Sequence, residues 1–92
     1  MKFVIKNTGE NTINLMRKIG YLSQRENQFV KPLERSGYPR FHLYIKENKE
    51  EIILDLHLDQ KRPVYKEAHD HAAEYEGKIV EDEAERIKQI LR

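Results

Sequence analysis

The chain contains no cysteine. That absence excludes a disulfide framework, a thiolate zinc site and a thiol nucleophile, and it argues against a small secreted scaffold. Long hydrophobic runs are also missing. The run formed by Phe3, Val4 and Ile5 is too short for a signal peptide, and no stretch approaches the roughly 20 apolar residues that a membrane helix needs. We therefore expect a cytoplasmic protein that does not enter a membrane.

Signatures of catalysis are missing as well. Ser23 and Ser36 are the only serines, and neither lies in a Gly-x-Ser-x-Gly elbow. The four glycines are isolated, so no glycine-rich phosphate loop exists. Asp55, His57 and Asp59 have acid–base chemistry available, but any solvent-facing strand carries such residues. A non-catalytic domain is favoured over an enzyme.

Length and charge limit the architecture. At 92 residues the chain predicts a single domain over residues 1–92 with one modest core. Residues 1–49 hold ten Lys and Arg against four Glu, whereas residues 50–92 hold seven against twelve Asp and Glu. This asymmetry fits a basic binding face with an acidic counter-face, two surfaces that pair between copies, or simply an acidic helix beside a basic sheet edge.

The N-terminal half predicts a strand, a helix and a second strand. Residues 2–6 alternate as a strand does, and residues 7–9 form a turn. Asn11 or Thr12 caps a short helix that ends before Gly20. Residues 21–27 are polar and read as a loop, and residues 28–33 form a strand whose Pro32 places it at an edge or a strand end. The helix has apolar positions at i, i+3 spacing: Ile13, Met16 and Ile19, with Leu15 beside them.

Residues 40–46 and 51–59 form the clearest pattern, because both alternate apolar and polar residues around the loop of residues 47–50. Pairing Lys46 with Glu51 places the two apolar sides together. This register sets His42 opposite Asp55 and Arg40 opposite His57.

The C-terminal region predicts helical structure. Pro63 suits the first turn of a helix, and an apolar stripe continues to Leu91. Gly77 interrupts the pattern, so residues 64–91 form one helix or two. The order is β-α-β-β-β-α, and we predict an α+β fold in which helices pack on one face of a three- to four-stranded antiparallel sheet. The other face stays at least partly open.

Four histidines and neighbouring carboxylates raise the possibility of a zinc or manganese site. On the predicted hairpin His42 and His57 share the open face, and Asp59 follows on the same side. If residues 64–76 are helical, His69 and His71 stand about 200° apart and cannot share one ion, so the workable pair is His71 with Glu74. If residues 66–71 form a loop instead, both histidines can bind the same ion. No known metal-binding spacing is matched. The candidate ligands are His42, His57, Asp59, His69, His71 and Glu74.

Nucleic acid is the alternative ligand. Arg40 and Tyr44 are expected on the open face, flanked by Lys31, Arg35 and Lys46, and further cations gather at Lys61, Arg62 and Lys66. The order α-β-β-β-α within residues 11–76 is similar to that of double-stranded-RNA-binding domains, and this likeness implies lysines at the start of the last helix. The family's Lys-Lys-x-Ala-Lys run is absent, however, and acidic residues occupy much of the same segment.

The segments GYPRFHLY (37–44), LHLDQK (56–61) and EYEG (74–77) resemble those of small prokaryotic proteins of unknown function. The likeness implies an established domain and no particular activity. The sequence thus predicts a small non-catalytic binding domain, a monomer or a homodimer, that acts through the open sheet face and the adjoining residues 57–75. Its ligand is a divalent metal, RNA or the ribosome, or an acidic protein partner.

Overall fold

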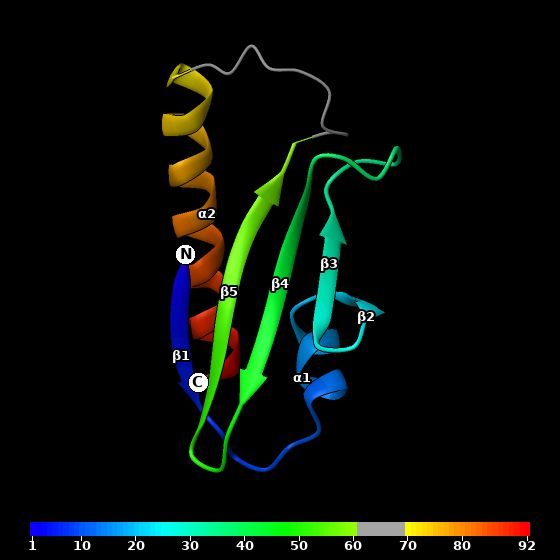
Figure 1. The fold of residues 1–92 in the computed structure, drawn as a ribbon, viewed down its shortest axis with the longest axis vertical. Coiled ribbons are helices and arrows are strands. Elements are labelled where there is room, and N and C mark those ends of the chain that lie inside the picture. Colours follow the sequence, from blue (N-terminus) through cyan, green and yellow to red (C-terminus); the bar gives the residue numbers. More distant parts are fainter. Residues whose placement is uncertain (61–69) are drawn as a thin grey trace.

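The computed structural model describes residues 1–60 and 70–92, with side chains for residues 1–60 and 77–92. Two helices pack behind an antiparallel sheet (Figure 1). The elements in chain order are β1 (Lys2–Lys6), α1 (Thr12–Lys18), β2 (Leu22–Arg25), β3 (Gln28–Pro32), β4 (Arg40–Glu47), β5 (Glu51–Asp59) and α2 (Asp70–Leu91).

In the part of the chain that the structure describes, the sheet has five strands in the order β1-β5-β4-β3-β2. The predicted α+β class with an antiparallel sheet is confirmed, but the predicted strand number and element order are wrong. The residues read as a loop include strand β2, which pairs with β3 through a tight turn in which Asn27 has a φ of 60°. All four β2 side chains are exposed, so the strand lacks the apolar alternation by which sequence reveals a strand. Among the described residues, four strands therefore lie between the two helices, unlike the α-β-β-β-α order expected from double-stranded-RNA-binding domains.

Helix α1 begins where the sequence predicts. The Asn11 side chain accepts a hydrogen bond from the backbone N–H of Asn14, 3.2 Å away, and so caps the first turn. Gly20 follows the helix with a φ of 88°, a conformation that side-chain-bearing residues rarely adopt. Ile13, predicted on the apolar stripe, is exposed instead, whereas Leu15 and Met16 are buried.

The hairpin of β4 and β5 forms, but its register differs by two residues from the predicted one. Ile45 pairs with Leu54, and Glu47 pairs with Ile52. The cause is a tighter loop, in which the Asn48 side chain accepts hydrogen bonds from the backbone N–H groups of Glu50 and Glu51. Because side chains alternate with a period of two, a two-residue shift changes the cross-strand partners and keeps every residue on its predicted face.

The core lies between the sheet and the helices. Leu43, Ile52, Leu54 and Leu56 are almost completely buried in the middle of the sheet, and Ile87 of α2 packs against them. Helix α2 runs through Gly77 without a break, which answers whether its described part is one helix or two. Neither helix, within the part of the chain that the structure describes, has the length and hydropathy of a bilayer-spanning segment.

A buried polar contact joins α2 to the residues after α1. Glu83 is only 6% exposed. Tyr21 donates a hydrogen bond to its carboxylate at 2.7 Å, and Arg86 donates two more at 2.8 Å each. Arg86 also donates to the backbone oxygen of Ile19 at 2.7 Å. This cluster links α2 to the residues after α1 through a carboxylate that is almost fully buried, so loss of a partner would leave that carboxylate unsatisfied.

Within this cluster the pKa of the acid Glu83 lies below its ordinary value, whereas the pKa values of Tyr21 and Arg86 lie above theirs. Burial alone would raise the pKa of Glu83, but the hydrogen bonds from Arg86 and Tyr21 and the charges of Arg86 and Lys31 outweigh it and lower the pKa below its ordinary value. Burial, and then the hydrogen bond to Glu83, raise the pKa of the Tyr21 phenol. The hydrogen bond to Glu83 also raises the pKa of Arg86.

We expect these shifts to limit stability at both ends of the pH scale. The Glu83 contribution is complete above the unfolded pKa of about 4.3 and is lost as the pH falls through the lower folded pKa. The Tyr21 contribution is complete below the unfolded pKa of about 10 and is lost as the pH rises above it. Urea denaturation at a series of pH values measures both losses. Glu83→Gln should flatten mainly the acid limb and Tyr21→Phe mainly the alkaline limb, with a smaller effect of each on the other limb because the two groups share a hydrogen bond. A variant that leaves its own limb unchanged contradicts the assignment.

Candidate functional site

The sheet face away from the helices is the candidate site, and we call it the open face. The strand registers place residues from all five strands on it. Its members are Lys2, Val4 and Lys6 of β1; Leu22 and Arg25 of β2; Gln28, Val30 and Pro32 of β3; Arg40, His42, Tyr44 and Lys46 of β4; and Glu51, Ile53, Asp55, His57 and Asp59 of β5.

The histidines at the centre of the open face are direct cross-strand partners. His42 pairs with His57, not with Asp55 as predicted, and Arg40 pairs with Asp59, not with His57. The two histidines nevertheless differ in environment. His42 is buried, with 8% of its surface exposed, whereas the His57 side chain is 48% exposed and lies 3.3 Å from an Asp55 oxygen.

Both ring nitrogens of His42 have partners. Nδ1 lies 3.3 Å from Asp59 Oδ2, and Nε2 lies 3.2 Å from the Gln28 side-chain oxygen. An ionised carboxylate only accepts, so Nδ1 carries a proton. Nε2 then donates to Gln28 when the ring is charged, or accepts from the Gln28 amide in its flipped orientation when the ring is neutral. A metal ion could reach His42 only by displacing one of these partners.

Arg40 completes this upper part of the open face. Its Nε donates to Asp59 Oδ2 at 3.2 Å, so one carboxylate oxygen serves Arg40 and His42 together. The guanidinium carbon of Arg40 also lies 4.8 Å from the centre of the Tyr38 ring, within cation–π range. The charges of Asp59 and Arg40 are therefore paired with each other, and Asp59 also contacts His42.

Tyr44 forms an aromatic surface below the histidines. Its ring stacks on His42 with centroids 4.5 Å apart and planes 16° apart, and it meets His57 edge-on at 5.5 Å. Tyr44 is nonetheless 43% exposed. The buried His42 thus supports a tyrosine ring that still presents surface to solvent.

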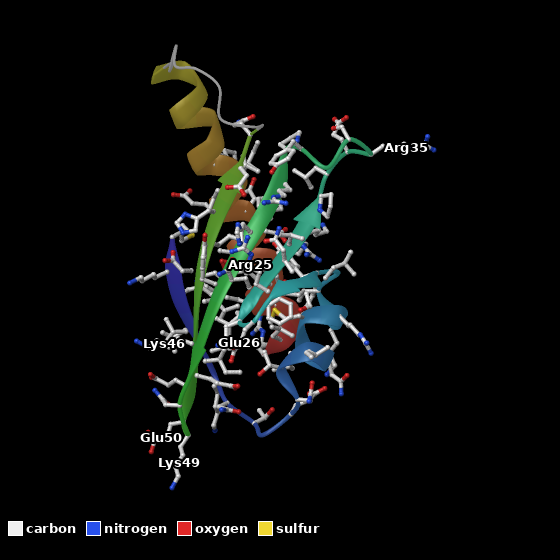
Figure 2. The ribbon with its side chains drawn as sticks, turned by 45° about the vertical axis from the view of Figure 1, so that its right-hand side comes forward. Arg25, Glu26, Arg35, Lys46, Lys49 and Glu50 are labelled. Atoms are coloured by element: carbon white, nitrogen blue, oxygen red, sulfur yellow. The ribbon has the colours of Figure 1, made fainter. Side chains whose placement is uncertain are left out.

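A row of polar residues crosses all five strands at the level of Tyr44. The registers connect them in the order Arg25, Gln28, Tyr44, Asp55 and Lys2. The cations Arg25 and Lys2 lie at the two ends of the row, and Lys46 lies two residues beyond Tyr44 on the same face of β4. Figure 2 shows Arg25 and Lys46 along the sheet, between Arg35 at one end of the molecule and Lys49 and Glu50 at the other.

The structure describes only part of the predicted metal site. It brings His42, His57 and Asp59 onto one face, as expected, but within residues 1–60 and 77–92 no three His, Asp or Glu residues are grouped as metal ligands. His69 and the side chains of His71 and Glu74 lie outside the described residues. Zinc or manganese binding therefore stays a prediction.

The predicted nucleic-acid residues divide in the same way. Arg40 and Tyr44 share the open face, as expected, whereas Lys61, Arg62 and Lys66 lie outside the described residues. Lys31, expected beside Arg40 on that face, pairs with Phe41 and belongs to the helix side.

Sequence reasoning missed Arg25 and Lys2. Lys2 follows from the alternation of residues 2–6 once β1 is paired with β5. Arg25 has no such signal, because it follows an irregularity in β2.

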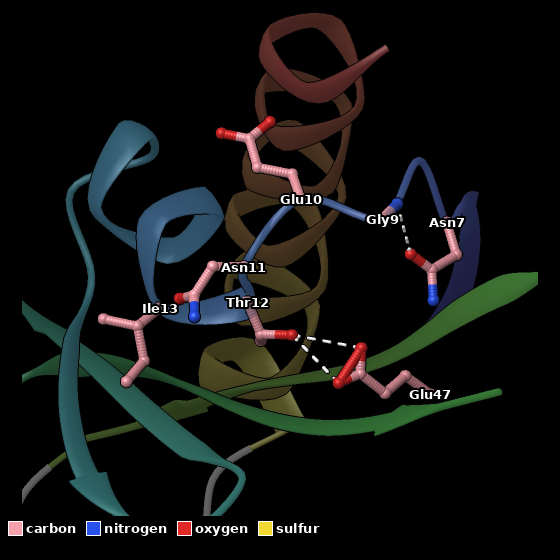
Figure 3. A pocket seen from close by; sticks show the side chains of 7 residues that line it. All are labelled: Asn7, Gly9, Glu10, Asn11, Thr12, Ile13 and Glu47. Carbon is pink, nitrogen blue, oxygen red and sulfur yellow. Dashed lines mark hydrogen bonds between the residues drawn. The ribbon is translucent and has the colours of Figure 1, made fainter. Parts of the chain in front are cut away.

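A separate depression of about 420 Å³ lies between the loop after β1 and the end of β4 (Figure 3). Its polar groups already have partners. The Thr12 hydroxyl donates to Glu47, at 3.0 Å from the nearer oxygen, and Glu10, which points away from Glu47, is paired with Lys18 at 3.0 Å. The open face is the stronger candidate because it combines exposed aromatic surface with cations that form no ion pair within residues 1–60 and 77–92.

Comparison with known proteins adds no assignment. No protein-family model matches the chain, and no curated protein and no solved structure matches it significantly. The resemblance to small prokaryotic proteins of unknown function accordingly stays a prediction.

The two paired histidines should respond differently to truncation. We expect His42→Ala to lower the free energy of unfolding by about 2 kcal/mol, because it leaves a void and removes a partner from both Asp59 and Gln28. His57→Ala should cost less than about 0.5 kcal/mol, since the side chain is half exposed. Chemical denaturation of both variants at neutral pH tests this. Equal losses would contradict the difference in environment.

Proposed function

We propose that this chain is a non-catalytic domain that binds single-stranded nucleic acid on its open face. The observation that carries the proposal is the exposed Tyr44 ring, which lies among cations that have no ion-pair partner within the described residues. Such proteins combine a positively charged surface that follows the phosphate backbone with aromatic rings on which bases stack. This function also fits the cytoplasmic location predicted from the sequence.

The charges of the open face favour an anionic ligand. Asp59 is engaged by Arg40 and His42, and Asp55 lies beside His57. By contrast, Lys2, Lys6, Arg25 and Lys46 form no ion pair with any residue that the structure describes. Of the three carboxylates that the described residues place on the open face, Asp59 is thus engaged by Arg40 and Asp55 by the N-terminal ammonium, 3.5 Å away. The four cations outnumber the remaining carboxylate, Glu51, which stands opposite Lys6, so the face keeps positive charge for phosphates.

Tyr44 supports a single-stranded ligand over a duplex. One side of the ring already stacks on His42, and no other ring contact of Tyr44 exists in the described part of the chain besides the edge of His57. A base placed on the exposed side would extend the stack from His42 through Tyr44. Bases are accessible for stacking in a single strand, whereas a duplex hides their faces.

The test is fluorescence anisotropy with a labelled oligouridylate and oligothymidylate of about 12 nucleotides. We expect Arg25→Glu/Lys46→Glu to weaken binding at least tenfold and to reduce the slope of log K against log salt by roughly 1.4, about 0.7 per lost phosphate contact. Tyr44→Leu should weaken binding about fivefold or more, because it removes the stacking ring. Tyr44→Phe keeps an aromatic ring and should therefore bind as tightly as the unchanged protein.

The matched control is Arg17→Glu/Arg92→Glu, which makes the same change in net charge on the helices. Equal weakening by the control pair would mean that only overall charge matters and would overturn the site. Another outcome is that polyglutamate binds as tightly as the oligonucleotides, with an affinity that Tyr44→Leu does not change. That result would contradict a nucleic-acid ligand and indicate an acidic protein partner. No binding of either oligonucleotide at low salt would overturn the proposal.

A further inference from the structure

The outer edge of β1 has backbone groups that point away from the sheet. Met1 and Leu56 exchange two backbone hydrogen bonds, of 2.8 and 2.9 Å, and the Asn7 N–H donates to Glu50. In an antiparallel ladder the residues that bond to one neighbour alternate with those that face the other side. The N–H and C=O groups of Lys2, Val4 and Lys6 therefore face outward, at a strand that ends the sheet.

The side chains along this edge carry a symmetric pattern. Val4 is 49% exposed, and it stands between Lys2 and Lys6, which share its face and form no ion pair with a described residue. On the opposite face Phe3 is buried beneath the helix layer, with the Lys88 ammonium 5.5 Å from its ring centre. The edge thus offers an apolar centre flanked by two lysines, each of which has a carboxylate, Asp55 or Glu51, opposite it on the inner side and none of the described residues on the outer side.

These charges select the occupant. If a second copy paired antiparallel about Val4, Lys2 of each copy would stand opposite Lys6 of the other. Like charges directly opposite each other destabilise a strand pair, and edge lysines are a known means of preventing self-association. A strand with acidic residues at the same two positions would instead meet both lysines favourably.

We propose that the β1 edge binds an extended acidic peptide as a sixth strand. The peptide has the pattern acidic-x-apolar-x-acidic, with its apolar residue beside Val4 and its acidic residues beside Lys2 and Lys6. Its three patterned residues exchange backbone hydrogen bonds with β1, and the two x residues turn their N–H groups away. The peptide and nucleic-acid proposals share Lys2 and Lys6, but the peptide also needs the outward backbone groups of β1, whereas the nucleic acid also needs Tyr44.

The test uses synthetic peptides and the intact protein. Isothermal titration compares Thr-Glu-Thr-Val-Thr-Glu-Thr with the same peptide carrying lysine for both glutamates, and we expect the acidic peptide to bind at least tenfold more tightly. Methylation of the central valine nitrogen should abolish binding, because that N–H faces β1. Methylation of the threonine nitrogen just before it should weaken binding less than threefold, because that N–H points away.

Two protein variants complete the design. Lys2→Glu/Lys6→Glu should reverse the preference, so that the lysine peptide binds better by a similar factor. Val4→Pro removes an outward N–H that no described residue accepts, and it should reduce peptide binding at least tenfold.

No binding of the acidic peptide at millimolar concentration would overturn the proposal. So would equal effects of the two methylations, or an unchanged preference in the double variant. Because only a strand partner distinguishes the two methylated peptides, this result is separable from failure of the nucleic-acid function.

Discussion

The pairing of β4 with β5 is the constraint on which the other features depend. It joins the two longest strands in the middle of the sheet, and their alternation assigns every second side chain to the core. Leu43, Leu54 and Leu56 become almost wholly buried as a result. The intervening residues are then forced onto the open face, so the histidines and Tyr44 meet there because the leucines must meet on the other side.

The same alternation explains which parts of the fold could be predicted. It fixes the face of each residue but not its partner, because a shift by two residues leaves the hydrophobic pattern intact. The partner depends on the loop, where one Asn48 side chain closes a tighter turn than sequence spacing indicates. The sequence does not predict strand β2, for a different reason. The strand pairs with β3, but all its residues are exposed, so its sequence lacks the alternation of apolar and polar residues that identifies a strand.

The candidate site was predictable to the extent that it lies on the hairpin. His42, His57, Tyr44 and Arg40 follow from alternation alone. Their hydrogen-bond partners do not follow from alternation, because Gln28 contacts His42 from a third strand and one oxygen of Asp59 contacts both Arg40 and His42. A histidine that looks in sequence like a free ligand is therefore a buried support for Tyr44, while its cross-strand partner, His57, remains half exposed.

The two ends of the open face consequently differ in what they can bind. Around Arg40 and Asp59 opposite charges lie within 3.3 Å of each other, and a ligand would have to break these contacts before gaining its own. Around Tyr44 the side chains of Lys2, Arg25 and Lys46 form no ion pair with the described carboxylates, so a phosphate gains their attraction without first disrupting such a pair. The attraction is therefore strongest on the half of the face that has the least internal structure to lose, and the His42 network serves that half by holding Tyr44 in place.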